Sequence, residues 1–296
     1  MDERTLKTLN IWERHQNRLR AAAAEKARRK MIAAAVRVYD GGLAYAELLR
    51  AARPDMIDAL EDITAETDRE IDGITEATED TDAQAAVEEI RTAAHTLTED
   101  RRRGVDVIGS ALLLPLAAWY AYTAATGTEH LKRTAALGYD AAAEQLKDRA
   151  VTIDRAAVIR DVVMNPWMDN EGYAAKMVSR MGKDRDQMLR TMGQRIARGD
   201  IYEDIAKDMA LGKTETAQKM MYRLIYTEGT HALNEATARA FEAAGDEEYE
   251  ISTVGDSRVC PVCAGIAGKV FRLADREAGI NFPPFHAGCR CSITVR

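Results

Sequence analysis

The cysteines of this 296-residue chain are confined to its C-terminal end. All four lie within the last 37 residues, Cys260 and Cys263 in the string CPVC and Cys289 and Cys291 in PPFHAGCRC, where His286 precedes them. Two short half-sites separated by about 22 residues are typical of a structural zinc site, in which each half-site supplies two ligands. The pattern therefore requires a C-terminal fold that brings the two strings together.

Five side chains are available for four tetrahedral positions. Cys260 and Cys263 form one half-site, and His286 and Cys289 have the same spacing, so we predict these four as ligands of a structural zinc ion. Cys291 alternates with Cys289 along an expected strand and is the alternative ligand. Reduced cysteines or a disulfide would also explain the cluster. Zinc is favoured because the charged N-terminus lacks the apolar segment of a signal peptide, which indicates a reducing compartment.

The predicted site is structural rather than catalytic. A zinc deaminase needs His-x-Glu ahead of Pro-Cys-x-x-Cys, but His231 is followed by Ala-Leu and Val259 precedes Cys260. The sequence contains no H-E-x-x-H, P-loop or G-x-S-x-G string. Four protein ligands also leave no coordination position for water. We therefore predict that the protein is not an enzyme and has no small-molecule substrate.

The composition, rich in Ala and Met and poor in Pro, Phe and Trp, favours a mainly α fold. We predict an elongated helical region, residues 1–165, with a basic N-terminus and an acidic middle, followed by a small α+β domain, residues 166–296. Helices are expected over residues 4–53, 55–100, 107–128, 129–164, 171–198, 200–210 and 214–244. Breaks are expected at Gly41-Gly42 and near 73–83, with Gly212 as a stop and Thr214 as an N-cap.

A short antiparallel sheet is predicted after Gly245, the C-cap residue of the last helix. Tyr249, Ile251 and Thr253 alternate with polar neighbours, and residues 269–271 and 292–295 have the composition of further strands. A sheet of this size buries too little apolar area to be stable alone. The predicted zinc-binding part, residues 246–296, would gain the missing free energy from metal binding.

Residues 107–128 carry no charge and follow three arginines at 101–103. The segment is long enough to cross a bilayer. It is, however, rich in Ala and Thr, and Pro115 lies in its middle. We predict a helix buried in a bundle, with membrane contact as the alternative.

The charges are unevenly distributed. Residues 1–30 carry nine basic and four acidic side chains, and we predict that they contact DNA or an acidic surface. Residues 55–100 carry sixteen acidic side chains against Arg69 and Arg91. That stretch is either a solvated helical face or a docking surface for a basic partner.

One polar face is expected on the helix over 214–244. Arg223, Thr227 and Asn234 recur at spacings of four and seven residues. This face is either solvated or hydrogen-bonded to the zinc-binding part. Asp256 and Arg258, which precede the first half-site, are candidates to join it.

The same region resembles the C-terminal domain of tailed-phage minor head proteins, the Mu F-like head-morphogenesis family. The resemblance is carried in order by residues 223–228 (RLIYTE), 234–236 (NEA), 256–263 (DSRVCPVC), 268–271 (GKVF) and 281–291 (NFPPFHAGCRC). It places Glu228 among the candidate interaction or domain-stabilising residues, with Arg223, Thr227, Asn234, Asp256 and Arg258. Trp12-Glu13-Arg14 is similar, more weakly, to the N-terminal opening of the family.

The resemblance implies a virion structural protein that acts at the portal vertex in capsid assembly and in genome packaging or exit. It implies the portal protein as a partner, with the major capsid or scaffolding protein as further candidates. The expected location is the phage head, after assembly in the host cytoplasm. Two other interpretations remain: a zinc-dependent nucleic-acid-binding protein, and a relative of the ADP-ribosyltransferases.

Overall fold

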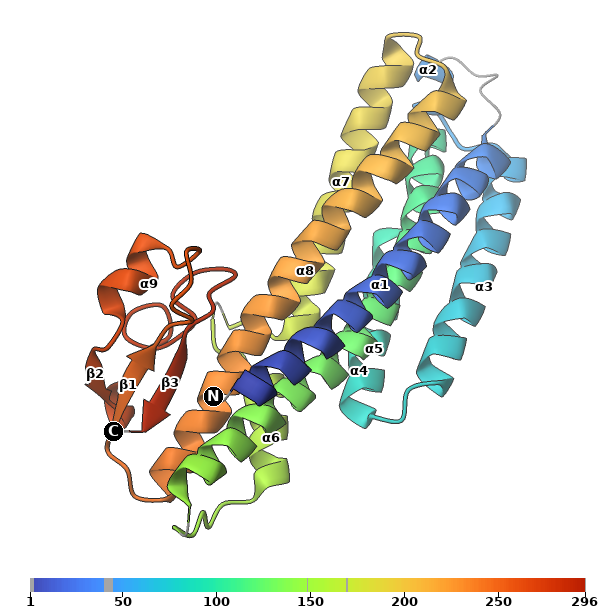
Figure 1. Cartoon of the computed structure of the whole chain (residues 1–296). Helices are drawn as coiled ribbons and strands as arrows, with labels where there is room; N and C mark the ends of the chain where they lie inside the picture. Colours follow the sequence, from blue (N-terminus) through green and yellow to red (C-terminus); the bar gives the residue numbers. More distant parts are fainter. Residues whose placement is uncertain (1–2, 40–44, 148, 169, 296) are drawn as a thin grey trace. The chain divides into compact units, whose positions relative to one another are not determined.

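The computed structural model describes residues 3–39, 45–147, 149–168 and 170–295 (Figure 1). In chain order its elements are α1 (Glu3–Val38), α2 (Tyr45–Leu48), α3 (Pro54–Glu76), α4 (Thr81–Leu97), α5 (Gly104–Leu146), α6 (Arg155–Met164), α7 (Tyr173–Ala197), α8 (Tyr202–Ala243), β1 (Glu248–Ser252), α9 (Pro261–Ile266), β2 (Val270–Arg272), the 3-10 helix η1 (Leu273–Asp275) and β3 (Ser292–Val295). The predicted fold class, mainly helical with a small antiparallel sheet near the C-terminus, is confirmed.

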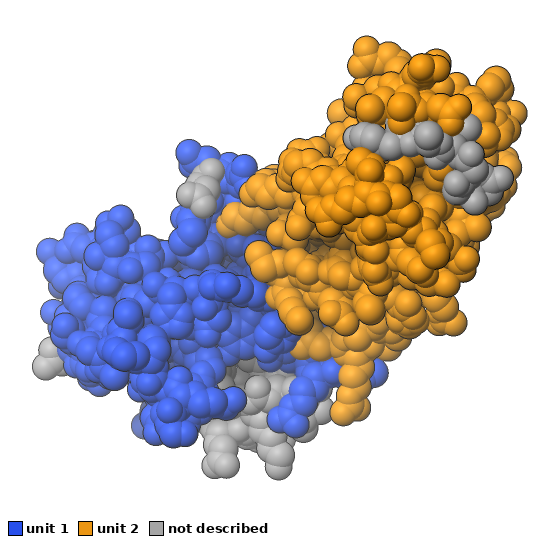
Figure 2. Space-filling view, turned by 90° about the horizontal axis from the view of Figure 1, so that it is seen from above, with its two compact units in different colours: residues 1–16, 127–173, 222–296 blue, residues 17–126, 174–221 orange. Residues whose placement is uncertain are grey.

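The chain divides into two compact units (Figure 2). Unit 1 comprises residues 1–16, 127–173 and 222–296, and unit 2 comprises residues 17–126 and 174–221. Helices α1, α5 and α8 therefore contribute residues to both units. The predicted domains, 1–165 and 166–296, follow the order of the chain instead, and that division stays a prediction.

Helix α5 supplies much of the buried apolar surface. Its leucines at 112, 113, 114 and 116 are each at most 1% exposed. The helix has the length and composition of a membrane span, but its most apolar window is wholly buried within the protein. Packing inside the fold thus accounts for the uncharged segment, as predicted.

A buried charged cluster joins three helices of unit 2. Asp184 of α7 is fully buried and accepts a hydrogen bond of 2.8 Å from the Tyr120 hydroxyl of α5. Its carboxylate lies 2.8 Å from the Arg180 guanidinium and 3.5 Å from Lys213 Nζ of α8. Burial lowers the pKa of Lys213, although the nearby Asp184 carboxylate opposes the shift. The buried carboxylate is therefore compensated by two cations, as a buried charge requires.

The acidic segment is partly neutralised by the basic N-terminal helix within unit 2. Lys26 and Lys30 of α1 lie 2.7 and 2.5 Å from the Glu70 carboxylate of α3. Arg37 of α1 lies 2.5 Å from Asp62 and 2.9 Å from Glu66. Exposed pairs of this kind are individually weak. Together they give the acidic face of α3 a basic partner inside the same chain.

The helix boundaries between residues 128 and 165 differ from the prediction. Helix α5 continues through the expected junction at 128–129, and the chain leaves it only at Lys147, whose φ is 52°. Helix α6 begins after Asp154, which accepts hydrogen bonds from the amides of Ala156 and Ala157. The break at 77–80 between α3 and α4 confirms the one expected near 73–83. The expected break at Gly41-Gly42 lies outside the described residues.

Helix α8 is continuous where the sequence predicts a stop. Gly212 lies inside it with open space around its Cα, and the Thr214 hydroxyl donates to the Ala210 carbonyl rather than capping a new helix. A glycine costs a helix only about 1 kcal/mol, which the burial of the inner face of α8 outweighs. Gly245 adopts a positive φ of 86° after the helix, as predicted for its C-cap.

The three-stranded sheet has the order β2-β1-β3, with both pairs antiparallel. Tyr249 of the central strand is buried and meets the Phe282 ring edge-on, with ring centroids 5.5 Å apart. Strand β3 pairs with β1 on one side only. Its outer edge is therefore available to another element of unit 1.

The start of the chain is anchored in unit 1 by an aromatic side chain. The Trp12 ring of α1 stacks on the His130 ring of α5, with centroids 4.6 Å apart and planes 5° from parallel. The Arg133 guanidinium lies 4.9 Å from the Trp12 ring centroid, a cation–π distance. Unit 1 is thus assembled from segments far apart in the sequence.

Two glycine-to-alanine substitutions should distinguish the effect of close helix packing on stability from the effect of helix propensity. A Cβ on Gly138 of α5 would lie 2.2 Å from the Leu233 carbonyl oxygen of α8, so Gly138→Ala is expected to destabilise the protein by about 1–3 kcal/mol. Gly212→Ala, in open space, should stabilise it by up to about 1 kcal/mol. Urea unfolding measures both. Equal effects of the two substitutions would contradict this packing of α5 on α8.

Candidate metal centre

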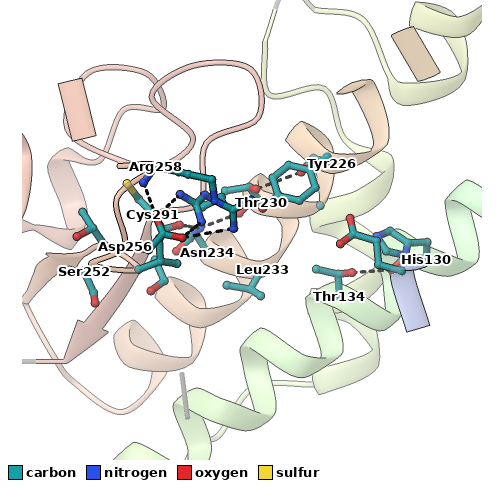
Figure 3. Close-up of a pocket in the computed structure, with 16 residues that line it drawn as sticks. His130, Thr134, Tyr226, Thr230, Leu233, Asn234, Ser252, Asp256, Arg258 and Cys291 are labelled. Carbon is teal, nitrogen blue, oxygen red and sulfur yellow. Dashed lines mark hydrogen bonds and ion pairs between the residues drawn. The ribbon is translucent and has the colours of Figure 1, made fainter. Parts of the chain in front are cut away.

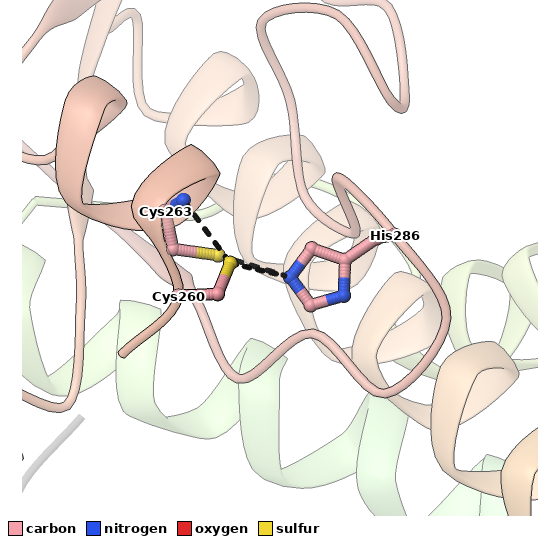
Figure 4. Close-up of side chains that lie close together, drawn as sticks. All are labelled: Cys260, Cys263 and His286. Carbon is pink, nitrogen blue, oxygen red and sulfur yellow. Dashed lines mark hydrogen bonds between the residues drawn. The ribbon is translucent and has the colours of Figure 1, made fainter. Parts of the chain in front are cut away.

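The first half-site is built by the short helix α9 (Figure 4). Cys260 is its N-cap residue, and its Sγ accepts a hydrogen bond from the Cys263 amide at 3.5 Å. Pro261 occupies the first turn, where its missing N–H costs nothing. Both sulfurs lie 3.2 Å from His286 Nε2. The histidine thus faces the open side of the CPVC turn.

The second pair of cysteines immediately precedes β3. Cys289 Sγ lies 3.9 Å from Cys263 Sγ, and the sulfurs of Cys263, Cys289 and Cys291 all lie within 4.8 Å of one another. A positive φ of 77° at Gly288 lets the chain turn between His286 and Cys289, whose amide donates to the His286 carbonyl. All five predicted donors therefore lie together, as two triads that share Cys263. They could hold a metal ion.

The ring of His286 is oriented by the adjacent backbone. Its Nδ1 lies 3.1 Å from the Ala287 carbonyl oxygen. Because a carbonyl only accepts, this bond places the proton on Nδ1 and leaves the lone pair on Nε2, which faces the sulfurs. A metal-binding histidine needs this tautomer, and a carbonyl partner of this kind is common in metal sites.

The cysteines differ in acidity when no metal neutralises them. A hydrogen bond from the Cys291 thiol lowers the pKa of Cys289 to about 5, and the Cys263 amide lowers the pKa of Cys260. Burial raises the pKa of Cys263 to about 12. Hydrogen bonding to Cys289, followed by burial, raises the pKa of Cys291. Each pair of cysteines thus contains one thiol with a lowered pKa and one with a raised pKa, and a metal that binds Cys263 must displace its proton.

Helix α8 contacts the backbone of the second half-site through two threonines. The Thr227 hydroxyl accepts a hydrogen bond of 3.1 Å from the Gly288 amide. The Thr230 hydroxyl lies 2.9 Å from the Cys289 carbonyl oxygen, to which it donates. Thr230 is not among the residues predicted from the sequence, although its spacing from Thr227 places it on the same helical face.

Asn234 extends this contact by one more turn. Its side chain is fully buried, and its Nδ2 donates to the Cys291 carbonyl at 3.1 Å. Its Oδ1 accepts from the Ile293 amide of β3 at 3.0 Å. Arg223, by contrast, is exposed on α8, outside this set of contacts.

Asp256 and Arg258 lie beside a cavity of about 460 Å³ in unit 1 (Figure 3). Asp256 forms a bidentate ion pair with Arg290, with distances of 2.6 and 2.7 Å, and accepts a hydrogen bond from the Arg258 amide. The Arg290 hydrogen bonds hold the pKa of Asp256 below its ordinary value. Arg290 lies between the two cysteines of the second half-site, so this pair ties the loop before α9 to that half-site. Arg290 was not predicted as a site residue, although its position between Cys289 and Cys291 in the sequence could have indicated a role at the cluster.

Glu228 lies on a neighbouring face of α8. Its carboxylate accepts a 2.6 Å hydrogen bond from Trp167 Nε1, and the Trp167 ring stacks on His231 with centroids 4.2 Å apart. The segment between α6 and α7 is thereby held against α8. Glu228 therefore stabilises the packing of unit 1 and lies apart from the cysteine cluster.

The same face carries a partly buried charge network. Glu235 accepts hydrogen bonds from Arg276 at 2.9 and 3.0 Å and from Arg239 at 3.0 Å. Arg239 also pairs with Asp161 of α6. Arg276 follows β2 and η1, so Glu235 links the loop that leads to His286 to the middle of α8.

Comparison with known proteins identifies the region that contains the cysteine cluster. A family model described as Phage Mu protein F like protein matches residues 186–294. Those residues form a Mu F like domain. No curated protein and no solved structure matched the chain.

The match begins within α7 and ends within β3, so it includes all five candidate metal donors and the polar faces of α8. Its family is one of structural phage head proteins involved in head morphogenesis. The match is consistent with a phage-associated structural protein. The domain start predicted at residue 166 stays a prediction.

The Glu235 network should contribute to stability in a pH-dependent way. Burial alone would raise the pKa of Glu235, but hydrogen bonds from Arg276 and Arg239 outweigh it and lower the pKa below 4.5. A lowered carboxyl pKa gives stability that is complete above 4.5 and is lost as the pH falls through the folded-state value. Glu235→Gln should therefore cost roughly 2 kcal/mol at neutral pH, and the difference from wild type should shrink below pH 4.

Urea unfolding across pH 2.5–7 measures this difference. Glu203→Gln is the matched control. Glu203 forms an exposed ion pair with Lys207 on α8, so its substitution should change stability little at any pH. A constant gap between Glu235→Gln and wild type over the whole range would show that the carboxylate charge is not involved.

Proposed function

We propose that this protein is a minor head protein of a tailed phage that acts at the portal vertex, in capsid assembly and in genome packaging or exit. The observation that carries the proposal is the Mu F like match over residues 186–294, which contains the whole cysteine cluster. The portal protein is the proposed partner, with the major capsid or scaffolding protein as further candidates. The proposed location is the virion.

We also propose that the cluster holds one structural zinc ion, bound by Cys260, Cys263, His286 and Cys289. Three thiolates and an imidazole are ligands that zinc prefers. Two thiolates at 2.3 Å from a tetrahedral ion lie about 3.8 Å apart, close to the 3.9 Å between the sulfurs of Cys263 and Cys289. The amide hydrogen bonds to the sulfurs of Cys260 and Cys289 favour these two as thiolates.

The proposed role of this zinc is to stabilise the fold. Four protein ligands fill a tetrahedral site, and a metal crosslink supports a sheet with strands of three to five residues. Zinc would join α9 to the chain before β3 and hold the two half-sites on α8.

DNA contact through residues 1–30 is part of the proposal. Lys26 and Lys30 pair with Glu70, so the contact would depend more on the exposed Arg14 and Arg18. Such contacts weaken as salt concentration rises.

The zinc assignment predicts metal content in the purified full chain. Wild-type protein should carry about one zinc per chain, and Cys263→Ser should carry almost none, because Cys263 belongs to both triads. Cys291→Ser is the matched control: both cysteines are buried, but Cys291 lies outside the proposed ligand set. Elemental analysis measures the metal. Zinc loss in Cys291→Ser with retention in Cys289→Ser would assign the fourth ligand to Cys291.

The proposed location predicts the behaviour of a phage that lacks this gene. Particles made without the protein should contain the capsid and portal proteins but show at least a tenfold loss of infectivity, which the wild-type gene should restore. Mass spectrometry of purified virions, together with pull-down of the portal protein by the tagged full chain, measures location and partner. Absence of the protein from infectious virions and from portal complexes would contradict the proposal.

A further inference from the structure

The polar face of α8 occupies the outer edge of β3, where a fourth strand would otherwise pair. An antiparallel strand would donate to one carbonyl of β3 and accept from a nearby amide. The side-chain amide of Asn234 makes both kinds of bond, donating to the Cys291 carbonyl and accepting from the Ile293 amide. Its second N–H donates to the Thr230 carbonyl one turn earlier. Both N–H groups and the oxygen of the buried amide are therefore hydrogen-bonded, which fixes its orientation.

Thr230 and Thr227 continue this row toward His286. Thr230 donates to the Cys289 carbonyl, and Thr227 accepts from the Gly288 amide. The three side chains are spaced by three and four residues on α8, so their contacts follow the chain from residue 288 to residue 293. We call Thr227, Thr230 and Asn234 the α8 ladder.

We propose that Thr230 and Asn234 of the α8 ladder are positioning residues of the metal centre, and that they set its affinity for zinc. This inference rests on the proposed zinc site. The ladder bonds the backbone of Cys289 and Cys291 directly, so it orders the second half-site before metal binds. Partners of metal ligands commonly change metal affinity by 10–100-fold when removed. The ladder side chains bond backbone groups of residues 288–293, so they would act on a bound zinc ion through the position of its ligands.

If the second half-site is already ordered before zinc binds, less conformational entropy is lost on binding and the affinity is higher. With the ladder present, Cys289 has a fixed backbone next to a rigid helix. Without it, the second half-site keeps the pairing of β3 with β1 and the Arg290–Asp256 ion pair but loses its attachment to α8. More backbone freedom must then be lost when zinc binds. Loss of a ladder bond should therefore weaken zinc binding more than it weakens the helical part of the fold.

The test compares two isosteric threonine substitutions on α8. Thr230→Val removes the bond to Cys289. Thr237→Val is the matched control: Thr237 is buried on the same helix and donates to the Gly138 carbonyl of α5, away from the metal centre. Asn234→Leu removes the bonds to Cys291 and Ile293. The apparent zinc dissociation constant of each full-length variant is measured by chelator competition, and thermal unfolding of each is measured in parallel.

Thr230→Val should bind zinc about tenfold more weakly than wild type, and Asn234→Leu should bind more weakly still. Thr237→Val should unfold at a lower temperature but bind zinc within about twofold of wild type. Cobalt substitution adds a structural readout: Thr230→Val should alter the visible absorption of tetrahedral thiolate-bound Co²⁺, and Thr237→Val should leave it unchanged. If Asn234→Leu does not fold, the comparison of Thr230→Val with Thr237→Val tests the proposal on its own.

Two results would overturn the proposal in different ways. Equal zinc affinity in Thr230→Val, Thr237→Val and wild type would refute the positioning role and leave the zinc site standing. Wild-type protein that binds no zinc would refute both the zinc assignment and this inference. The assignment to phage head proteins is independent of either result, because it rests on the family match.

Discussion

The side-chain amide of Asn234 takes the place of a neighbouring strand at the outer edge of β3. A three-stranded sheet leaves two edges, and an open edge can pair with other chains. Here one edge is closed by a helix whose side chains satisfy the backbone in directed hydrogen bonds. The small C-terminal module is therefore attached to α8 by specific polar contacts as well as by the burial of residues such as Tyr249 and Phe282.

Much of the C-terminal module could be predicted because its signals are local. The spacing of the cysteines and His286 indicated the cluster, the alternation around Tyr249 indicated β1, and Gly245 marked the end of α8. Each signal depends on a few adjacent residues. The same holds for the break between α3 and α4, where Asp80 caps the second helix.

The missed features depend on contacts between distant segments. Nothing near Gly212 reveals that α8 continues, because packing along the helix outweighs a local cost of about 1 kcal/mol. The role of Thr230 likewise requires the position of Cys289, which lies 59 residues further along the chain. The pairing of Lys30 with Glu70 also joins separate helices. The numbers of charged residues identify the basic segment 1–30 and the acidic segment 55–100. They do not show that residues of the two segments form ion pairs with each other.

The discontinuous make-up of unit 1 has a consequence for synthesis on the ribosome. Trp12 leaves the ribosome more than a hundred residues before its stacking partner His130, and the remainder of unit 1 begins only at residue 222. Chains emerge from the N-terminus and fold as their partners appear. The first turns of α1 therefore lack their contacts with the rest of unit 1 while residues 17–126 of unit 2 are synthesised. Unit 1, including the cysteine cluster, can therefore be completed only after all the residues of unit 2 have been synthesised.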